Sequence, residues 1–218
     1  MPRIAFFDLD KTLIAVNSAT LWVRREIKDG RISLWGAARA AYWTFLYELG
    51  FARIERAIED GIRTLTGQPE SDMVERVRSF FEEEARALLR PGAERAVQRH
   101  LQAGDQVALL TSSSCYLGGH FADLLGASHT LANRFEVDDR GRFTGEPVKP
   151  LCYGPGKVHY AQRLADELGA DLSDCAFYTD SYADVPVLER VGHPVAVHPD
   201  PRLKRVATQR GWPIEVWS

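Results

Sequence analysis

Residues 4–13 read IAFFDLDKTL, and the fold is decided by this stretch. Four apolar residues in a row are typical of a strand buried on both faces of a parallel sheet. Two aspartates, Asp8 and Asp10, follow at once, with one leucine between them. Carboxylates at the end of a buried strand cost free energy unless a cation or hydrogen-bond donors satisfy them. The stretch therefore predicts a buried strand that ends in an acidic site with such partners.

The composition of the chain is that of an ordinary globular protein. Of its 218 residues, 45% are hydrophobic and 26% are charged, which allows one large domain or one domain plus a small one. The formal net charge of -3, without a long basic run, indicates that nucleic acid is not a partner. An odd number of cysteines without CxxC spacing indicates a reducing compartment and no disulfide framework: Cys115, Cys152 and Cys175.

The sequence gives no sign of export or membrane insertion. Its first ten residues, MPRIAFFDLD, lack the long apolar region and cleavage site of a signal peptide, so we expect a cytoplasmic protein. The most apolar stretch, residues 34–49, is short for a membrane span and contains Arg39 and Glu48. We interpret it as a packed helix of a small domain, with a membrane-surface helix as the alternative. The oligomeric state stays open.

The chain divides into a helical stretch and an alternating stretch. Residues 18–89 predict four successive helices, which form a small bundle: from about 18 to a turn at 29–30, 34–49, 51–65 and 71–89. Beyond residue 91, predicted strands at 106–114, 175–181, 193–197 and 213–217 are joined by helices at 92–103, 115–125, 157–168 and 201–209, with a hairpin at 134–147. This alternation predicts an α/β fold with a Rossmann-like, mostly parallel sheet. We expect residues 1–16 and 90–218 to form this core and residues 17–89 to be inserted into it.

Polar side chains gather where the predicted strands end. In open parallel sheets, ligands bind beyond the carboxyl ends of the strands. Carboxylates that converge there need a hard divalent cation such as Mg²⁺, and hydroxyls, backbone N–H groups and a lysine suit a phosphate. Such a site points to phosphoryl transfer with an aspartate as nucleophile. The residues concerned are Asp8, Asp10, Thr111, Ser112, Lys157, Asp180, Ser181 and Asp184.

Four motifs in this order resemble those of the haloacid dehalogenase superfamily, in particular its phosphoserine-phosphatase-like branch (subfamily IB). They are DLDKTL (8–13), VALLTSS (107–113), GPGKV (154–158) and YTDSYAD (178–184). The resemblance covers the core from residue 3 to about 197. It implies that the inserted residues 17–89 form the small helical cap of this branch. It also implies an enzyme, a phosphatase acting on a small phosphorylated metabolite.

The resemblance implies a role for each matching residue in the chemistry. Asp8 would attack phosphorus and form an aspartyl-phosphate. Asp10 would protonate the leaving oxygen and then deprotonate the attacking water. Mg²⁺ would be held by the Asp8 carboxylate, the main-chain carbonyl of Asp10 and Asp180.

The same resemblance implies the residues that bind phosphate. Thr111 and the N–H of Ser112 would bind phosphate oxygens. Lys157 would neutralise charge on the nucleophile and on the phosphoryl group. Asp184 would complete the acidic site, through water or by orienting Lys157.

The chain departs from the branch at several positions. Phosphoserine phosphatases carry a glutamate nine residues after the nucleophile, which binds the substrate amino group, and here Asn17 stands there. Ser112 and Ser113 replace the usual glycines of the second motif, and Thr179 and Ala183 replace a glycine and an asparagine of the fourth. We therefore expect Asn17 to select a substrate other than phosphoserine, histidinol phosphate being one candidate.

Plainer interpretations exist for the same residues. The acidic residues and the hydroxyl cluster are also typical of turns and helix caps, and Lys157 of a solvated surface. The six histidines lack metal-ligand spacing, which favours structural roles, and the aromatic residues of the cap are most simply its core: Trp22, Trp35, Tyr42, Trp43, Phe45 and Tyr47. At the level of function, a phosphotransferase or mutase and a non-catalytic phosphate-binding protein remain as alternatives to a phosphatase.

Overall fold

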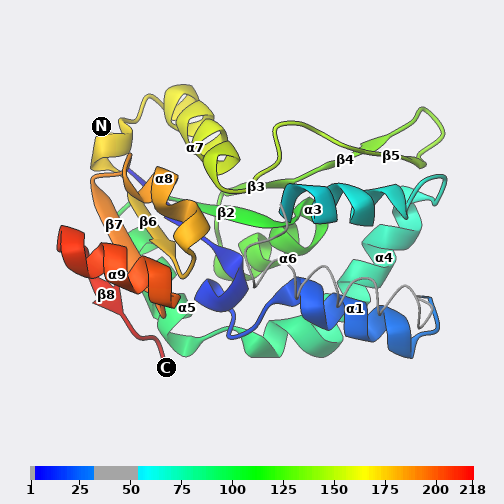
Figure 1. Cartoon of the computed structure of the whole chain (residues 1–218), viewed down its shortest axis with the longest axis horizontal. Helices are drawn as coiled ribbons and strands as arrows, with labels where there is room; N and C mark the ends of the chain where they lie inside the picture. Colours follow the sequence, from blue (N-terminus) through cyan, green and yellow to red (C-terminus); the bar gives the residue numbers. More distant parts are fainter. Residues whose placement is uncertain (1–2, 32–53) are drawn as a thin grey trace.

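The computed structural model describes residues 3–31 and 54–218, which form an α/β core joined to a group of helices (Figure 1). Six parallel strands make the central sheet in the order β3-β2-β1-β6-β7-β8, and β1 lies in its middle. The predicted α/β class with a parallel sheet is therefore confirmed. The strands are β1 (Ile4–Phe7), β2 (Gln106–Ser114), β3 (His129–Asn133), β6 (Ala176–Thr179), β7 (His193–Val197) and β8 (Ile214–Glu215).

Helices cover both faces of this sheet. Because strand side chains alternate, Ala5 and Phe7 belong to one hydrophobic core and Ile4 and Phe6 to another, and all four are buried. The first core includes side chains of α5 (Pro91–Gln102) and α6 (Cys115–Leu125). The second includes side chains of α7 (Pro155–Leu168), α8 (Val185–Leu188) and α9 (Pro201–Arg210).

The inserted region contributes α1 (Ser18–Lys28), α3 (Ile54–Arg63) and α4 (Glu70–Phe80). The predicted helix at 34–49, with Trp35, Tyr42, Trp43, Phe45 and Tyr47, lies outside the described residues. Trp22 packs edge-on against Phe80, with ring centroids 5.4 Å apart. No helix within the described residues is long and apolar enough to span a membrane.

The helix predicted over 71–89 is present over nearly this range, but it is not a regular α-helix throughout. After α4 the backbone widens into a π-helical turn at Phe81–Ala85 and then tightens into a 3-10 turn at Arg86–Leu88. Phe80 packs against Trp22 of α1, whereas its neighbour Phe81 packs against Phe121 of α6, with 5.1 Å between ring centroids. A π turn is one known means of changing the phase of a helix.

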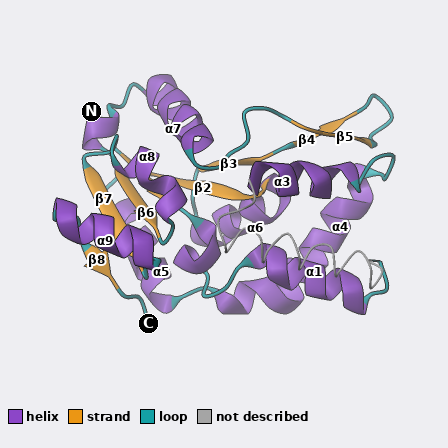
Figure 2. Cartoon of the chain, in the orientation of Figure 1, coloured by secondary structure: helices purple, strands orange, loops and turns teal. Residues whose placement is uncertain are grey.

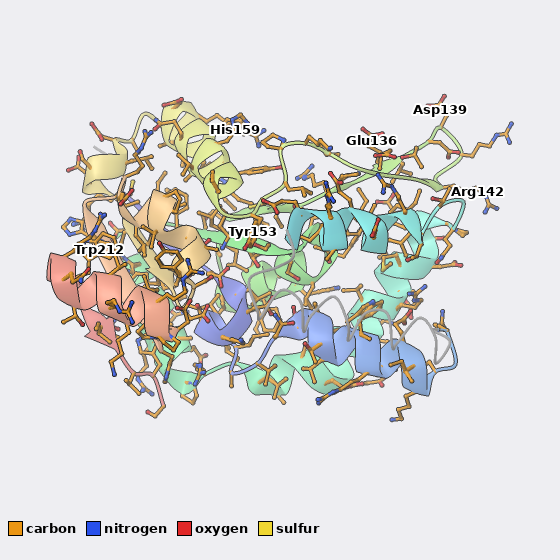
Figure 3. All side chains as sticks on the ribbon, viewed as in Figure 1. Glu136, Asp139, Arg142, Tyr153, His159 and Trp212 are labelled. Atoms are coloured by element: carbon orange, nitrogen blue, oxygen red, sulfur yellow. The ribbon has the colours of Figure 1, made fainter. Side chains whose placement is uncertain are left out.

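The sequence also misses β3, which pairs with β2 at the edge of the sheet. By contrast, the hairpin predicted at 134–147 forms from β4 (Phe135–Val137) and β5 (Phe143–Pro147), and it extends away from the central sheet beside α3 (Figure 2). Its backbone joins the α3–α4 connection: Gly67 N–H donates to Phe143 O at 2.8 Å, and Phe143 N–H donates to Gln68 O at 3.0 Å. Arg142, labelled with Glu136 and Asp139 in Figure 3, donates to Gly67 O at 2.6 Å. A hairpin of the core sequence thus holds the helices of the inserted region.

Candidate active site

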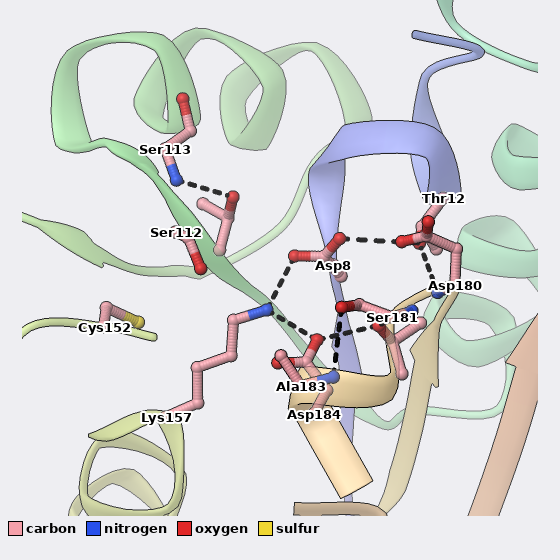
Figure 4. A network of polar contacts seen from close by, with 12 residues as sticks. Asp8, Thr12, Ser112, Ser113, Cys152, Lys157, Asp180, Ser181, Ala183 and Asp184 are labelled. Atoms are coloured by element: carbon pink, nitrogen blue, oxygen red, sulfur yellow. Dashed lines mark hydrogen bonds and ion pairs between the residues drawn. The ribbon is translucent and has the colours of Figure 1, made fainter. Parts of the chain in front are cut away.

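The carboxyl ends of β1, β2 and β6 lie side by side because β1 pairs with both neighbours. Phe7 is in register with Leu109 of β2 and with Tyr178 of β6. Asp8 therefore emerges between Thr111 on one side and Asp180 on the other. Parallel pairing at this point brings residues that are 103 (Thr111) and 172 (Asp180) positions after Asp8 in the chain into one site, which Figure 4 shows from close by.

Lys157 joins two of the predicted acidic residues (Figure 4). Its Nζ lies 2.8 Å from Asp8 Oδ1 and 2.8 Å from Asp184 Oδ2, and all three side chains are buried. Pro155 and Gly156 start the helix α7 so that Lys157 lies in its first turn. Burial alone would lower the pKa of Lys157, but Asp184 and Asp8 raise it above its ordinary value. Lys157 is therefore a fixed buried cation and not the solvated surface lysine of the plainer interpretation.

Thr12 lies between the other two carboxylates of the cluster. The Asp180 N–H donates to Thr12 Oγ1 at 3.0 Å, and the same oxygen lies 3.5 Å from Asp8 Oδ2 and 3.4 Å from Asp180 Oδ1. The turn that carries Thr12 is tight, because Lys11 adopts a left-handed conformation with φ 58°. No role is assigned to this threonine from the sequence, although it belongs to the first motif. Its position four residues after Asp8 is the sequence feature that could have indicated a place in the site.

Asp10 lies in the turn after β1, and its side chain reaches the start of α1, where Oδ1 accepts a hydrogen bond of 2.7 Å from the Ser18 N–H. Burial raises the pKa of Asp10, and the Ser18 hydrogen bonds oppose that rise. Asn17 precedes the same helix and caps it: its Oδ1 accepts from Thr20 N at 3.0 Å and from Thr20 Oγ1 at 3.2 Å. Asn17 is exposed, and its selection of substrate stays a prediction.

The second predicted motif forms an irregular end of β2. Between Leu110 and Ser114 the pairing with β3 shifts, so that three residues of β2 lie between two paired positions where β3 has one. Thr111 is fully buried there, and its Oγ1 accepts the Ser113 N–H at 3.1 Å. Bulges of this kind re-aim the chain next to active sites. Thr111 and Ser112 thus leave the sheet ladder, and Ser112 lies on the side of the site where Figure 4 shows Lys157.

A second threonine, Thr179, makes a hydrogen bond to the acidic cluster through Asp184. Its Oγ1 donates to Asp184 Oδ2 at 2.7 Å and accepts the Ser181 N–H at 3.2 Å. Ser181 in turn accepts the Ala183 N–H at 3.2 Å. Sequence reasoning noted Thr179 only as a departure from a glycine. Its hydroxyl completes a chain of buried polar contacts from Thr179 through Asp184 and Lys157 to Asp8.

Comparison with known proteins identifies the group to which this site belongs. Residues 5–189 match the model of the haloacid dehalogenase-like hydrolases, which is most of the chain. The chain belongs to this family. Among its relatives, an inhibition of morphological differentiation protein of Streptomyces azureus is 37% identical over 98% of this chain and 78% of that protein. A probable phosphatase of Mycobacterium tuberculosis is 36% identical over 98% of this chain and 75% of that protein.

A third relative spans the same length as this haloacid dehalogenase-like hydrolase. A histidinol-phosphatase of Neisseria meningitidis is 29% identical over 98% of both chains. A solved structure of a Bordetella pertussis protein of unknown function has a TM-score of 0.90 at 30% identity, again covering 98% of both chains. A substrate-bound phosphoserine phosphatase has the same fold, with a TM-score of 0.70 at 20% identity over 94% of this chain and 90% of that chain. The chain is thus an enzyme, a phosphatase of the haloacid dehalogenase type, and the non-catalytic alternative is set aside.

The donor atoms of the site fit a hard divalent cation. Burial raises the pKa of Asp8 to about 8 and that of Asp180 to about 7, in both cases with Asp184 adding to the rise, so the two carboxylates need a cation to remain ionised near neutral pH. Over residues 3–31 and 54–218, no three His, Cys, Asp or Glu side chains form a ready-made metal cage. Two carboxylates plus a main-chain carbonyl and water are instead what Mg²⁺ accepts. The residues present in this hydrolase therefore fit Mg²⁺.

Proposed function

We propose that this hydrolase is a Mg²⁺-dependent phosphomonoesterase that acts on a small phosphorylated metabolite through an aspartyl-phosphate at Asp8. The observation that supports this best is the environment of Asp8. One of its carboxylate oxygens accepts from the buried Lys157 ammonium, and the other faces Thr12 and Asp180. A nucleophile needs such compensation, because a carboxylate buried without a cation takes up a proton and loses its nucleophilicity.

In the first step, an Asp8 oxygen attacks phosphorus while the bond from phosphorus to the leaving oxygen breaks. Asp10 donates its proton to that oxygen, which leaves as an alcohol. In the second step, Asp10 takes a proton from water, the water oxygen attacks phosphorus, and the Asp8 carboxylate is released together with inorganic phosphate. The raised pKa of Asp10 supports this role, because a buried carboxyl holds a proton more readily than an exposed one.

Mg²⁺ would be held by the carboxylates of Asp8 and Asp180 and by the main-chain carbonyl of Asp10. Bound there, the ion would offset the negative charge that builds up on the phosphoryl oxygens during transfer. Thr12 keeps Asp180 in place for this purpose through the hydrogen bond from the Asp180 N–H. Asp184 is not proposed as a ligand, because its Oδ2 already accepts from Lys157 and Thr179.

The phosphate would be bound by Lys157, by the Thr111 hydroxyl and by the Ser112 N–H. The Thr111 oxygen accepts the Ser113 N–H, which leaves the hydroxyl hydrogen for an anion. Asp184 and Ser181 support this set, since Asp184 orients the Lys157 ammonium and Ser181 shapes the turn that carries Asp184. Hydrogen-bond donors held in place around a phosphoryl group stabilise the charge of the transition state, and this is the main cause of rate enhancement in such reactions.

Residues 17–89 would act as the cap that excludes water and selects the substrate. A substrate amino group needs an anionic partner under such a cap. Asn17 carries no charge, and Glu26, further along the same helix α1, is already paired with Arg76, so we propose that phosphoserine is a poor substrate. A ring-bearing ester such as histidinol phosphate is the favoured class. We place the enzyme in the cytoplasm, in agreement with its three free cysteines.

The proposal is tested by phosphate release from a panel of phosphorylated metabolites in the presence of Mg²⁺. Hydrolysis of at least one small monoester, with water as the acceptor, is the expected result. Transfer of the phosphoryl group to an added alcohol or sugar in preference to water would identify the phosphotransferase or mutase alternative. Failure to hydrolyse any panel member or a generic ester such as p-nitrophenyl phosphate would contradict the proposal.

A further inference from the structure

We propose that Asn133 is a positioning residue that sets the phosphate-binding backbone of β2 relative to Lys157. This inference rests on the proposed phosphatase function. Asn133 is the last residue of β3 and is 1% exposed. Its amide makes two hydrogen bonds in opposite directions: Nδ2 donates to Ser112 O at 2.7 Å, and Oδ1 accepts the Cys152 N–H at 2.8 Å. Each bond reaches one of the two segments proposed to bind phosphate.

The first bond fixes the peptide group between Ser112 and Ser113. This peptide lies in the irregular end of β2, where the ladder to β3 is interrupted. Its carbonyl accepts from Asn133, and its N–H donates to Thr111 Oγ1 at 3.1 Å. With both ends held, the peptide cannot rotate without losing a buried hydrogen bond. The Thr111 oxygen is thereby kept as an acceptor from the Ser113 N–H. The hydroxyl hydrogen of Thr111 then remains available to the proposed phosphate.

The second bond fixes the loop that leads to Lys157. Cys152 is fully buried, and the next turns are tightly made: Tyr153 N–H donates to Leu151 O at 2.9 Å, and Lys157 N–H donates to Gly154 O at 3.0 Å. A Cβ atom at Gly156 would lie 1.9 Å from the Leu151 oxygen, so the first turn of α7 packs directly against this loop. These short contacts connect Cys152 to Lys157 at the start of α7, so a shift of Cys152 should also shift Lys157.

The Asn133 amide thus links the end of β2 to the loop before Lys157, the two segments proposed to bind the same phosphate. A displacement of reacting groups by about 1 Å can reduce a rate by about 100-fold. Loss of the Asn133 amide should let the Ser112–Ser113 peptide move relative to Lys157. The effect should appear in the binding of phosphate and of the transition state and not only in the stability of the fold.

The test compares Asn133→Ala and Asn133→Asp with a matched control, Cys152→Ala. Asn133→Ala removes both hydrogen bonds. Asn133→Asp keeps size and the acceptor for Cys152, but it places an oxygen in front of the Ser112 carbonyl. Cys152→Ala removes a buried side chain and its 3.4 Å contact with Leu131 O, yet it keeps the backbone N–H that Asn133 binds. All three are assayed with p-nitrophenyl phosphate and Mg²⁺, with inorganic phosphate as competitive inhibitor, and by thermal unfolding.

Both Asn133 variants should lower kcat/KM by about 10- to 100-fold and raise the inhibition constant of inorganic phosphate by about tenfold. Cys152→Ala should change kcat/KM and the inhibition constant of inorganic phosphate by less than about threefold, even if it lowers Tm as much as the Asn133 variants do. Unchanged phosphate inhibition in a folded Asn133 variant, or an equal loss in Cys152→Ala, would overturn the inference. If Asn133→Ala does not fold, Asn133→Asp decides.

Failure of the proposed function is distinguishable from failure of this inference. If the wild-type enzyme does not hydrolyse p-nitrophenyl phosphate, the proposed function fails first. Calorimetric titration with inorganic phosphate and Mg²⁺ then still compares the variants: weaker binding in both Asn133 variants than in Cys152→Ala supports the positioning role, and equal binding overturns it.

Discussion

Replacement of Lys157 by methionine, which has similar length and no charge, should destabilise the metal-free protein strongly. Lys157 is 2% exposed and lies 2.8 Å from each of two buried carboxylates, so the substitution leaves Asp8 and Asp184 without their cation. Removing one partner of a buried ion pair costs about 3–5 kcal/mol. At 1.4 kcal/mol per factor of ten, the folding equilibrium should fall by more than about 100-fold.

The assay is urea unfolding in EDTA near neutral pH, followed by tryptophan fluorescence. Lys149→Met is the matched control, because Lys149 is 65% exposed and makes a surface ion pair of 2.9 Å with Glu59, and such pairs contribute less than about 1 kcal/mol. The double variant Lys157→Met/Asp184→Asn should recover part of the stability, since it removes the Asp184 charge that Lys157 no longer compensates, but none of the activity. A change in unfolding free energy below about 0.5 kcal/mol in Lys157→Met, as for an ordinary surface substitution, would refute this account of the buried cluster.

Three further outcomes follow from the same site. EDTA should abolish turnover, Mg²⁺ should restore it, and Ca²⁺ should restore it poorly because its looser coordination shell misplaces Asp8; full activity in metal-free buffer would argue against the metal. Because burial raises the pKa of Asp8 to about 8 and of Asp180 to about 7, the metal-free folded state holds protons that the unfolded chain releases above about pH 4. Its stability should therefore fall as pH rises from about 4 to 8, and the increase in Tm on adding Mg²⁺ should grow over the same range; an increase independent of pH would contradict this. Finally, kcat/KM for phosphoserine should lie well below that of the best ester in a metabolite panel. A first place for phosphoserine would show that the argument from the uncharged Asn17 is wrong and that an acidic group elsewhere holds the amine.

The sequence predicts the sheet and the main acidic residues because both depend on local patterns. The strand at 106–114 and the helix at 115–125 have the predicted bounds, since a run of apolar residues is followed by Ser114, whose side chain caps the helix. Convergence of Asp8, Lys157 and Asp184 follows from one general rule, that parallel strands end at a common edge.

What the sequence misses depends on contacts between distant segments. Strand β3 (HTLAN) is short and contains three polar residues, so that only its pairing with β2 makes it a strand. Asn133 has no motif signal, because its two partners lie 19 and 21 positions away along the chain. The change from α-helix to π turn after Phe80 likewise accompanies a contact with a distant segment, that of Phe81 with Phe121 of α6.

The central claim is that Asp8 is the nucleophile, and the most direct test is to trap its phosphorylated form. The wild-type enzyme is mixed with a ³²P-labelled monoester and Mg²⁺, quenched in acid within the first turnovers, and digested for mass spectrometry, with Asp8→Asn treated in parallel. Label should be found on the peptide that carries Asp8, should be released by alkali, and should be absent from Asp8→Asn, whose turnover should fall by several powers of ten. Label on another residue, or near-normal turnover by freshly purified Asp8→Asn with deamidation excluded, would contradict the mechanism.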